Sequence, residues 1–390
     1  MCAVPAQFTT TADLNAYGRA PGAEHVVERR GGPGSYRGVT ALPSSAFQPL
    51  LGARALADWI RQGGKPARAP LGYRLRQRWH SHWFELNWRT QLERMPRGEL
   101  PADPVLIVGL WRSGTTVLHE LVSACGGWVT PQTWQCFNPS TCFLTGAPAR
   151  SAAVQRPMDQ GVIASTGPQE DEFALLLLGE RSIYRGLIDP RRLLDCGRAS
   201  WSESEDGFDR WQHFVRGIAA GGGRLLLKSP GHTFRIPTMR RLFPRARFVW
   251  IGRHPGEVWA SNVRMWTAMM RVYALWECPA DMLERFMHES MRACADVLMR
   301  CIEEMTQENL LWVDFEALQT DPERVLRQIL QFVGDRPGHD ERALAADIET
   351  ALSSVPIHRG DRAAMPDDES VLQLDRLMRA ARQRFGEGEA

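Results

Sequence analysis

The chain has 390 residues, with 44% apolar residues, 24% charged residues and a net charge of +2. These values are ordinary for a globular protein, and the small net charge gives no support to nucleic-acid binding. The longest apolar stretch, FALLLLG at 173–179, is too short to cross a bilayer, so no membrane span is expected.

The first hundred residues are expected to form an N-terminal segment, extended or helical, that packs on the core of the protein and is called the lead below. Residues 1–50 are rich in Gly, Pro, Ser and Arg, and they lack the basic and apolar regions of a signal peptide. Further on, Trp79, Trp83 and Leu86 recur at helical spacing, which predicts an amphipathic helix with these side chains in the core. The sequence therefore predicts a lead over 1–100 and an α/β domain over 101–390.

Short apolar runs alternate with helical patterns from residue 105 onward. Strands are predicted at 105–110, 224–230, 246–255 and 309–318, and helices at 114–125, 233–244, 256–275 and 321–334. Strands and helices that alternate at this spacing form a parallel sheet with helical crossovers. The predicted fold class is α/β, a three-layer, P-loop-like fold with a central parallel sheet flanked by helices.

The first predicted strand leads into a loop with the outline of a phosphate-binding loop. Residues 109–116, GLWRSGTT, have the glycine spacing of GxxxxGK[ST], but Thr115 stands where the lysine is usual. Such a turn directs backbone N–H groups and the positive end of a helix at an anion, and Arg112 and Thr116 add further donors. The missing lysine argues against a kinase, whose loop lysine contacts the β- and γ-phosphates.

Two more basic residues stand at predicted strand ends. Arg253 lies near the carboxyl end of the segment at 246–255, and Ser261 lies eight residues later in the next helix, where both can converge on a second phosphate. Lys228 ends the strand at 224–230. Lysine occurs elsewhere in the chain only at Lys65, which indicates that Lys228 serves as a compact point charge.

Four blocks of the sequence together resemble the sulfotransferases that use 3′-phosphoadenosine 5′-phosphosulfate (PAPS), in particular the bacterial-type branch. They are VGLWRSGTTVLHEL, similar to the 5′-phosphosulfate loop; FVWIGRHPGEVWASN, similar to the 3′-phosphate motif; LLLKSPGH, similar to the lysine-bearing strand end; and LLWVDFEALQTDPERVLRQILQFVG, similar to the C-terminal block. The blocks stand in the family's order over about residues 104–334.

The resemblance implies that PAPS is the co-substrate and that no metal takes part. The residues that would bind the 5′-phosphosulfate are Arg112, Ser113, Gly114, Thr115 and Thr116. Arg253 and Ser261 would hold the 3′-phosphate, and Arg359, in the HRG segment at 358–360, would add to that site. Lys228 would stabilise the charge that develops on the leaving oxygen.

The acceptor hydroxyl must lose a proton, and two sources of a base are present. His232 lies four residues after Lys228 and is the first candidate. The rival is the acidic segment GPQEDEF, in which Glu170 or Glu172 precedes an apolar helix. An ordinary alternative for these acids is that they stabilise the positive end of that helix.

The expected function is transfer of a sulfuryl group from PAPS to a hydroxyl or an amine of a small molecule, such as a lipid, a phenol or a natural product. A P-loop kinase and an inactive nucleotide-binding protein are the alternatives. Aromatic residues near the motifs would line an acceptor pocket or, for most of them, belong to the core: Trp111, Trp128, Trp134, Phe137, Phe143, Trp266 and Trp276. The eight cysteines show no metal-ligand spacing and indicate reduced thiols in the cytoplasm.

Overall fold

The computed structural model describes residues 71–96, 99–149, 153–155, 162–334, 341–357, 366 and 368–386. The predicted Arg359 site lies outside the described residues, as does most of the lead over 1–100. The strands are β1 Val105–Val108, β2 Trp128–Val129, β3 Ala153–Gln155, β4 Val162–Ala164, β5 Arg224–Lys228, β6 Arg247–Gly252 and β7 Leu310–Asp314. Within the described ranges, no helix combines the length and the apolarity needed to cross a membrane.

Helices make up most of the described chain. In the first half they are α3 Leu71–Arg94, α4 Thr115–Ala124, α5 Thr133–Phe137, α6 Cys142–Thr145, α7 Glu172–Leu177, α8 Arg185–Ile188, η2 Pro190–Arg192 and α9 Leu193–Trp201. In the second half they are α10 Asp209–Ala219, α11 Pro230–Thr233, α12 Ile236–Leu242, α13 Pro255–Tyr273, α14 Met282–Glu304, α15 Phe315–Thr320, α16 Pro322–Val333, α17 Glu341–Ser354 and α18 Glu369–Phe385.

The central sheet is parallel, as predicted, with the strand order β2-β5-β1-β6-β7. The first strand of the described residues, β1, lies in the middle, and later strands lie on both sides of it. The strand order therefore reverses at β1. In open α/β sheets such a reversal leaves a crevice at the carboxyl ends of the strands, where ligands bind.

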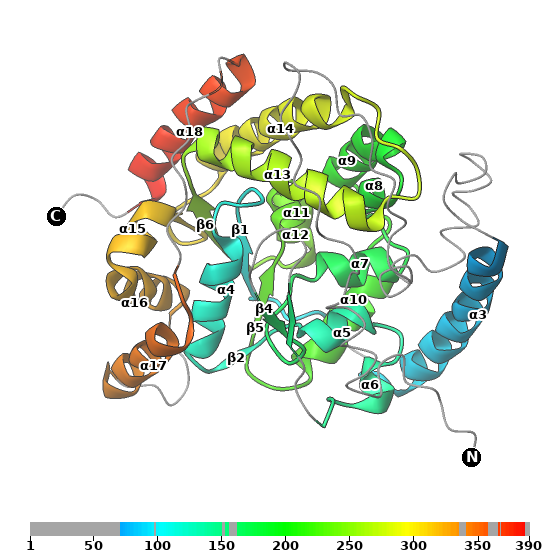
Figure 1. Ribbon diagram of the computed structural model, residues 1–390. Helices are drawn as coiled ribbons and strands as arrows, with labels where there is room; N and C mark the ends of the chain where they lie inside the picture. The colour runs from blue at the N-terminus through cyan, green and yellow to red at the C-terminus, as the bar shows by residue number, and fades with distance from the viewer. Residues whose placement is uncertain are drawn as a thin grey trace.

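Alternate residues of β1 enter two separate hydrophobic cores. Leu106 and Val108 belong to the core shared with α13 and α14, whereas Val105 and Ile107 belong to the core shared with α4, α16 and α17. Figure 1 shows α15, α16 and α17 grouped beside α4, with α13 and α14 in a separate group. The sheet is thus covered on both faces, which confirms the three-layer prediction.

All four predicted strands end earlier than predicted, and the largest difference is in β7. The predicted strand at 309–318 ends at Asp314, and the residues that follow form the helix α15. The reason is the pairing of β7, which has only β6 beside it, and β6 stops at Gly252, opposite Asp314. The edge strand β2 and the antiparallel pair β3–β4 were not predicted, because segments of two or three residues carry no periodic signal.

The aromatic residues near the motifs belong to the core, as favoured above. Trp111, Trp266 and Trp276 are buried. The others are partly buried and pack against the two cores: Trp128, Trp134, Phe137 and Phe143.

The helix predicted from Trp79, Trp83 and Leu86 is present as α3, but the prediction of its buried face is wrong. Trp79 is 64% exposed and Leu86 is 47% exposed, while Trp83 is half-buried. The covered face instead carries Trp88, which is 4% exposed, and Gln91, which hydrogen-bonds the backbone after α5. Helical spacing reveals an apolar stripe, but the surface that the neighbouring segments offer decides which stripe is covered.

This difference predicts unequal effects of two tryptophan substitutions in α3. Trp88→Ala removes a buried ring and should lower the free energy of unfolding by about 3–5 kcal/mol. Trp79→Ala, at an exposed position of the same helix, should change it by no more than about 0.5 kcal/mol. Urea denaturation followed by circular dichroism measures both values. Equal losses in the two variants would contradict the assigned packing face.

Candidate active site

The loop between β1 and α4 has the shape of an anion cradle. Gly109 and Gly114 have φ angles of 143° and 105°, and Arg112 is also left-handed, with φ 70°. A side chain at Gly114 would collide with Phe315, because its Cβ would lie 2.4 Å from the ring. The N-cap residue of α4 is Gly114, which has no side chain to accept from the first N–H groups of that helix.

Contacts from other elements fix this loop. Thr233, at the end of α11, accepts a hydrogen bond from the N–H of Gly109 and donates one to the carbonyl of Gly109, at 2.8 and 2.9 Å. Asn262, in α13, donates to the carbonyl of Trp111 at 2.7 Å. Ser113 turns its hydroxyl and its N–H inward, to the carbonyl of Leu110. Ser113 therefore stabilises the bend of the loop.

The structure brings the second predicted anion site against the first. Arg253 follows β6 and donates to the carbonyl of Arg112 at 3.1 Å, while Arg112 Nε donates to Ser261 Oγ at 3.0 Å. Arg253 also pairs with Glu257 at 2.9 Å and lies over the ring of Phe315. Two arginines and a serine from β1, β6 and α13 thus converge at the carboxyl edge of the sheet.

Lys228 lies next to the loop, at the end of β5. Its Nζ lies 3.1 Å from Glu170 Oε2 and 3.5 Å from Thr116 Oγ1. Lys228 is only 2% exposed. A buried ammonium group needs an opposite charge close by, and Glu170 supplies it.

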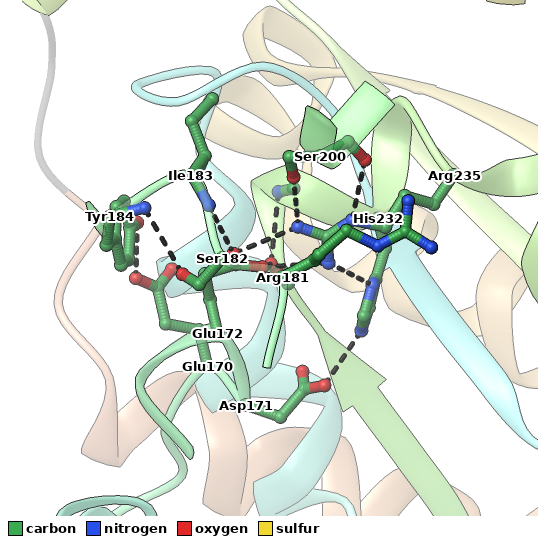
Figure 2. A network of polar contacts seen from close by, with 12 residues as sticks. Glu170, Asp171, Glu172, Arg181, Ser182, Ile183, Tyr184, Ser200, His232 and Arg235 are labelled. Carbon is green, nitrogen blue, oxygen red and sulfur yellow. Dashed lines mark hydrogen bonds and ion pairs between the residues drawn. The ribbon is translucent and has the colours of Figure 1, made fainter. Parts of the chain in front are cut away.

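Three consecutive carboxylates pair in order with three basic side chains from the segment that starts at the end of β5. The pairs are Glu170 with Lys228, Asp171 with His232, and Glu172 with Arg235, at 3.1, 2.8 and 2.9 Å. Figure 2 shows the last two pairs and the segment that carries the acids. These acids do not decorate an exposed helix end, because all three are buried.

Glu172 belongs to a closed ion pair. Both of its oxygens accept from Arg235, at 2.9 Å each, and further bonds come from Ser229 and from the N–H of Ile183. Arg235 in turn donates to the carbonyl and the hydroxyl of Ser200 (Figure 2). Glu172 is fully buried, and its partners lie in the interior. Through Arg235, which precedes α12 and bonds Ser200 in α9, the ion pair connects α7 to both of these helices.

Asp171 and His232 form a second closed pair. Asp171 Oδ2 lies 2.8 Å from His232 Nε2 and accepts from Trp211 Nε1 at 2.7 Å. Burial by itself raises the pKa of Asp171, but the charge and hydrogen bond of His232 and the bond from Trp211 lower it overall. Because an ionised carboxylate can only accept, His232 must carry a proton on Nε2, which faces Asp171. The other ring nitrogen of His232, Nδ1, lies 3.4 Å from Arg235 Nη1. Both ring nitrogens of His232 are therefore engaged.

Glu170 is the acid that faces the loop. Its Oε2 pairs with Lys228, and its Oε1 accepts from the hydroxyl of Tyr184 at 2.6 Å. The hydroxyl of Tyr184 also accepts from Trp111 Nε1 at 3.1 Å. Sequence reasoning missed Tyr184, because the segment around it, RSIYRG, carries no motif.

These features define a class of protein: an α/β fold in which two predicted anion sites adjoin and a lysine–carboxylate pair lies beside them. Residues 104–336 match the model described as "Sulfotransferase family", which is more than half of the chain. The chain therefore belongs to the sulfotransferase family.

Comparisons with individual proteins agree with this assignment. The chain is 30% identical, over 245 residues, to the omega-hydroxy-beta-dihydromenaquinone-9 sulfotransferase Stf3 of Mycobacterium bovis and to that of Mycobacterium tuberculosis. The match covers 59% of this chain and 62% of the length of each relative.

Solved structures confirm the fold. Sulfotransferase STF9 from Mycobacterium avium aligns with 88% of this chain and 96% of its own, with a TM-score of 0.58 and 16% identity. Sulfotransferase STF1 from Mycobacterium tuberculosis H37Rv aligns with 87% of this chain and 94% of its own, with a TM-score of 0.55 and 14% identity. At such low sequence identity, these two similarities show only that the folds are alike.

The buried pair of Glu172 and Arg235 predicts a large loss of stability when one partner is neutralised. Glu172→Gln leaves the Arg235 guanidinium without its counter-charge and should lower the free energy of unfolding by about 3–5 kcal/mol. Glu289→Gln is the matched control, because Glu289 pairs with Arg198 at the surface and its loss should be far smaller. Guanidinium denaturation measures both variants, and similar losses would refute a stabilising role specific to the buried pair.

Proposed function

We propose that this protein transfers the sulfuryl group of PAPS to a hydroxyl of an apolar small molecule and releases adenosine 3′,5′-bisphosphate. The observation that carries the proposal is the position of the Lys228–Glu170 pair beside the loop from β1 to α4. A cation and a carboxylate at this place supply the two functions that sulfuryl transfer needs, stabilisation of the leaving oxygen and removal of a proton.

The two adjoining anion sites match the two charged ends of the donor. Arg112, Gly114, Thr115 and Thr116 would bind the 5′-phosphosulfate through the loop backbone, the hydroxyls and the guanidinium, with Ser113 holding the bend.

The 3′-phosphate would bind at the second anion site. Arg253 and Ser261 would contact it, and Arg112, bonded to Ser261, would join the two sites. An arginine and a serine for the 3′-phosphate would distinguish PAPS from ATP, which has no phosphate there. No metal is part of the proposal, and neither is Arg359.

The reaction is an in-line displacement at sulfur. The acceptor oxygen forms a bond to sulfur while the bond from sulfur to the 5′-phosphate oxygen breaks, and that oxygen leaves with negative charge. Lys228 stabilises this charge. The proton of the acceptor hydroxyl passes to Glu170.

Among the three predicted bases, the surroundings favour Glu170. His232 is fully buried, and both ring nitrogens are engaged by Asp171 and Arg235. Glu172 is fully buried and closed off by Arg235. Glu170 is 8% exposed, and its partner Lys228 adjoins the loop.

An apolar alcohol is the favoured class of acceptor. The related Stf3 proteins are named for a hydroxylated menaquinone, omega-hydroxy-beta-dihydromenaquinone-9. Next to Tyr184, the partner of Glu170, the ring of Phe173 packs at 5.2 Å, and Phe173 also stacks on Phe137 at 4.9 Å.

We place the reaction in the cytoplasm, because every cysteine among the described residues is a free thiol.

Calorimetric titration tests the donor. Adenosine 3′,5′-bisphosphate should bind about tenfold or more tightly than AMP, because a charged hydrogen bond to the extra phosphate contributes at least about 1.5 kcal/mol. Arg253→Ala should remove most of that preference, with a smaller loss of affinity for AMP because Arg253 also bonds the carbonyl of Arg112. Tighter, magnesium-dependent binding of ATP would contradict the proposal and favour a kinase.

Turnover tests the base. Sulfate transfer from ³⁵S-labelled PAPS is measured with farnesol, 2-naphthol and tyramine, and the acceptor with the highest rate is kept. Glu170→Gln should lower kcat by about 10²–10⁴-fold, since the hydroxyl loses its general base. The variant should still bind adenosine 3′,5′-bisphosphate, and this binding shows that it is folded although Lys228 has lost its counter-charge. A variant that keeps the full rate would eliminate Glu170 as the base and return attention to His232.

A further inference from the structure

A chain of hydrogen bonds connects the candidate phosphate loop to Glu170. Trp111, inside the loop, donates from Nε1 to the hydroxyl of Tyr184 at 3.1 Å, and Tyr184 lies 2.6 Å from Glu170 Oε1. Trp111 and Tyr184 are each 4% exposed. Figure 2 shows the Tyr184 hydroxyl directed at the Glu170 carboxylate.

Chemistry fixes the direction of this chain. An indole N–H can only donate, so the Tyr184 oxygen must accept from Trp111, and its own proton points at Glu170. Burial first, and then the charge and hydrogen bond of Glu170, raise the pKa of Tyr184 well above its ordinary value. Tyr184 therefore stays a neutral donor, and Glu170 Oε1 stays an acceptor.

Packing holds both rings of the chain in place. The ring centroid of Trp111 lies 5.4 Å from that of Trp266 and 5.5 Å from that of Phe234. Tyr184 is packed between Phe173, at 5.2 Å, and Trp266, at 6.1 Å. Because the carbonyl of Trp111 is also bonded to α13, neither donor can turn away without disturbing the core or the loop.

We propose that Tyr184, oriented by Trp111, is a positioning residue that fixes the Glu170 carboxylate and directs its Oε2 at the acceptor hydroxyl. We assign Oε2 because its partner Lys228 adjoins the loop, whereas Oε1 is directed at the buried Tyr184, and a carboxylate oxygen with one donor keeps a second lone pair. The inference rests on the proposed function insofar as Glu170 is the base. The hydrogen-bond geometry itself does not depend on it.

Few other titratable groups face the Glu170 carboxylate. Lys228 approaches from the end of β5, and Tyr184 from the turn before α8. Cys136, in α5, feels the charge of Glu170, but burial, followed by the charge of Asp171, raises its pKa, so it remains a neutral thiol. A change in the titration of Glu170 on loss of the Tyr184 hydroxyl would therefore report that single hydrogen bond.

The test follows the carboxyl carbon of Glu170 by ¹³C NMR in protein labelled at glutamate Cδ and saturated with adenosine 3′,5′-bisphosphate. The signal is assigned by its absence in Glu170→Gln. In Tyr184→Phe the carboxylate loses a donor, so the titration midpoint should move to higher pH by about one unit. Replacing Tyr184 by 3-fluorotyrosine, whose hydroxyl is a stronger donor, should move it to lower pH.

The matched control is Tyr273→Phe, which removes the hydroxyl of another buried tyrosine and should leave the midpoint unchanged. A midpoint that stays in place in both Tyr184 variants overturns the inference. This outcome is independent of the turnover of Glu170→Gln, which alone decides whether Glu170 is the base.

Discussion

The structure of the candidate site depends on one constraint: three consecutive carboxylates are buried, and each needs a partner that donates a hydrogen bond to it. A buried charge without a partner is costly, and partners of fixed position therefore determine where a segment can lie. Lys228 at the end of β5, His232 in α11 and Arg235 just before α12 supply these partners. The pairs of Asp171 with His232 and of Glu172 with Arg235 fix residues 170–172 against the core. Glu170 is thereby placed beside the loop between β1 and α4.

Arginine and lysine have divided roles in these pairs. Arg235 forms a two-pronged bond with Glu172, which suits a permanent ion pair because the planar guanidinium matches the carboxylate. Lys228 makes a single contact with Glu170 Oε2. A point charge on a flexible stem can move from one oxygen to another without breaking a two-pronged bond. In a chain with lysine at only two positions, this difference explains why lysine stands at 228.

The sequence predicted the parts of the fold that carry strong local signals. The apolar runs before Gly109, Lys228 and Arg253 identified three of the central strands, and their order implied a parallel sheet. The buried face of α3 was predicted wrongly, because the covering surface comes from residues beyond position 130. The pairing of Glu170 with Lys228 spans 58 residues, and only the fold brings such distant charges together. Tyr184 had no motif to reveal it.

The loop itself shows how the fold stabilises an unfavourable backbone. A non-glycine residue at positive φ costs about 1–3 kcal/mol, and it persists only where its surroundings over-determine it. Arg112 is such a residue, with φ 70°, and its carbonyl and its side chain are bonded to Arg253 and Ser261. Asn262 and Thr233 hold the residues before it. Because protein contacts maintain this conformation, the N–H groups of the loop are already oriented before an anion binds, and binding need not supply the free energy of ordering them.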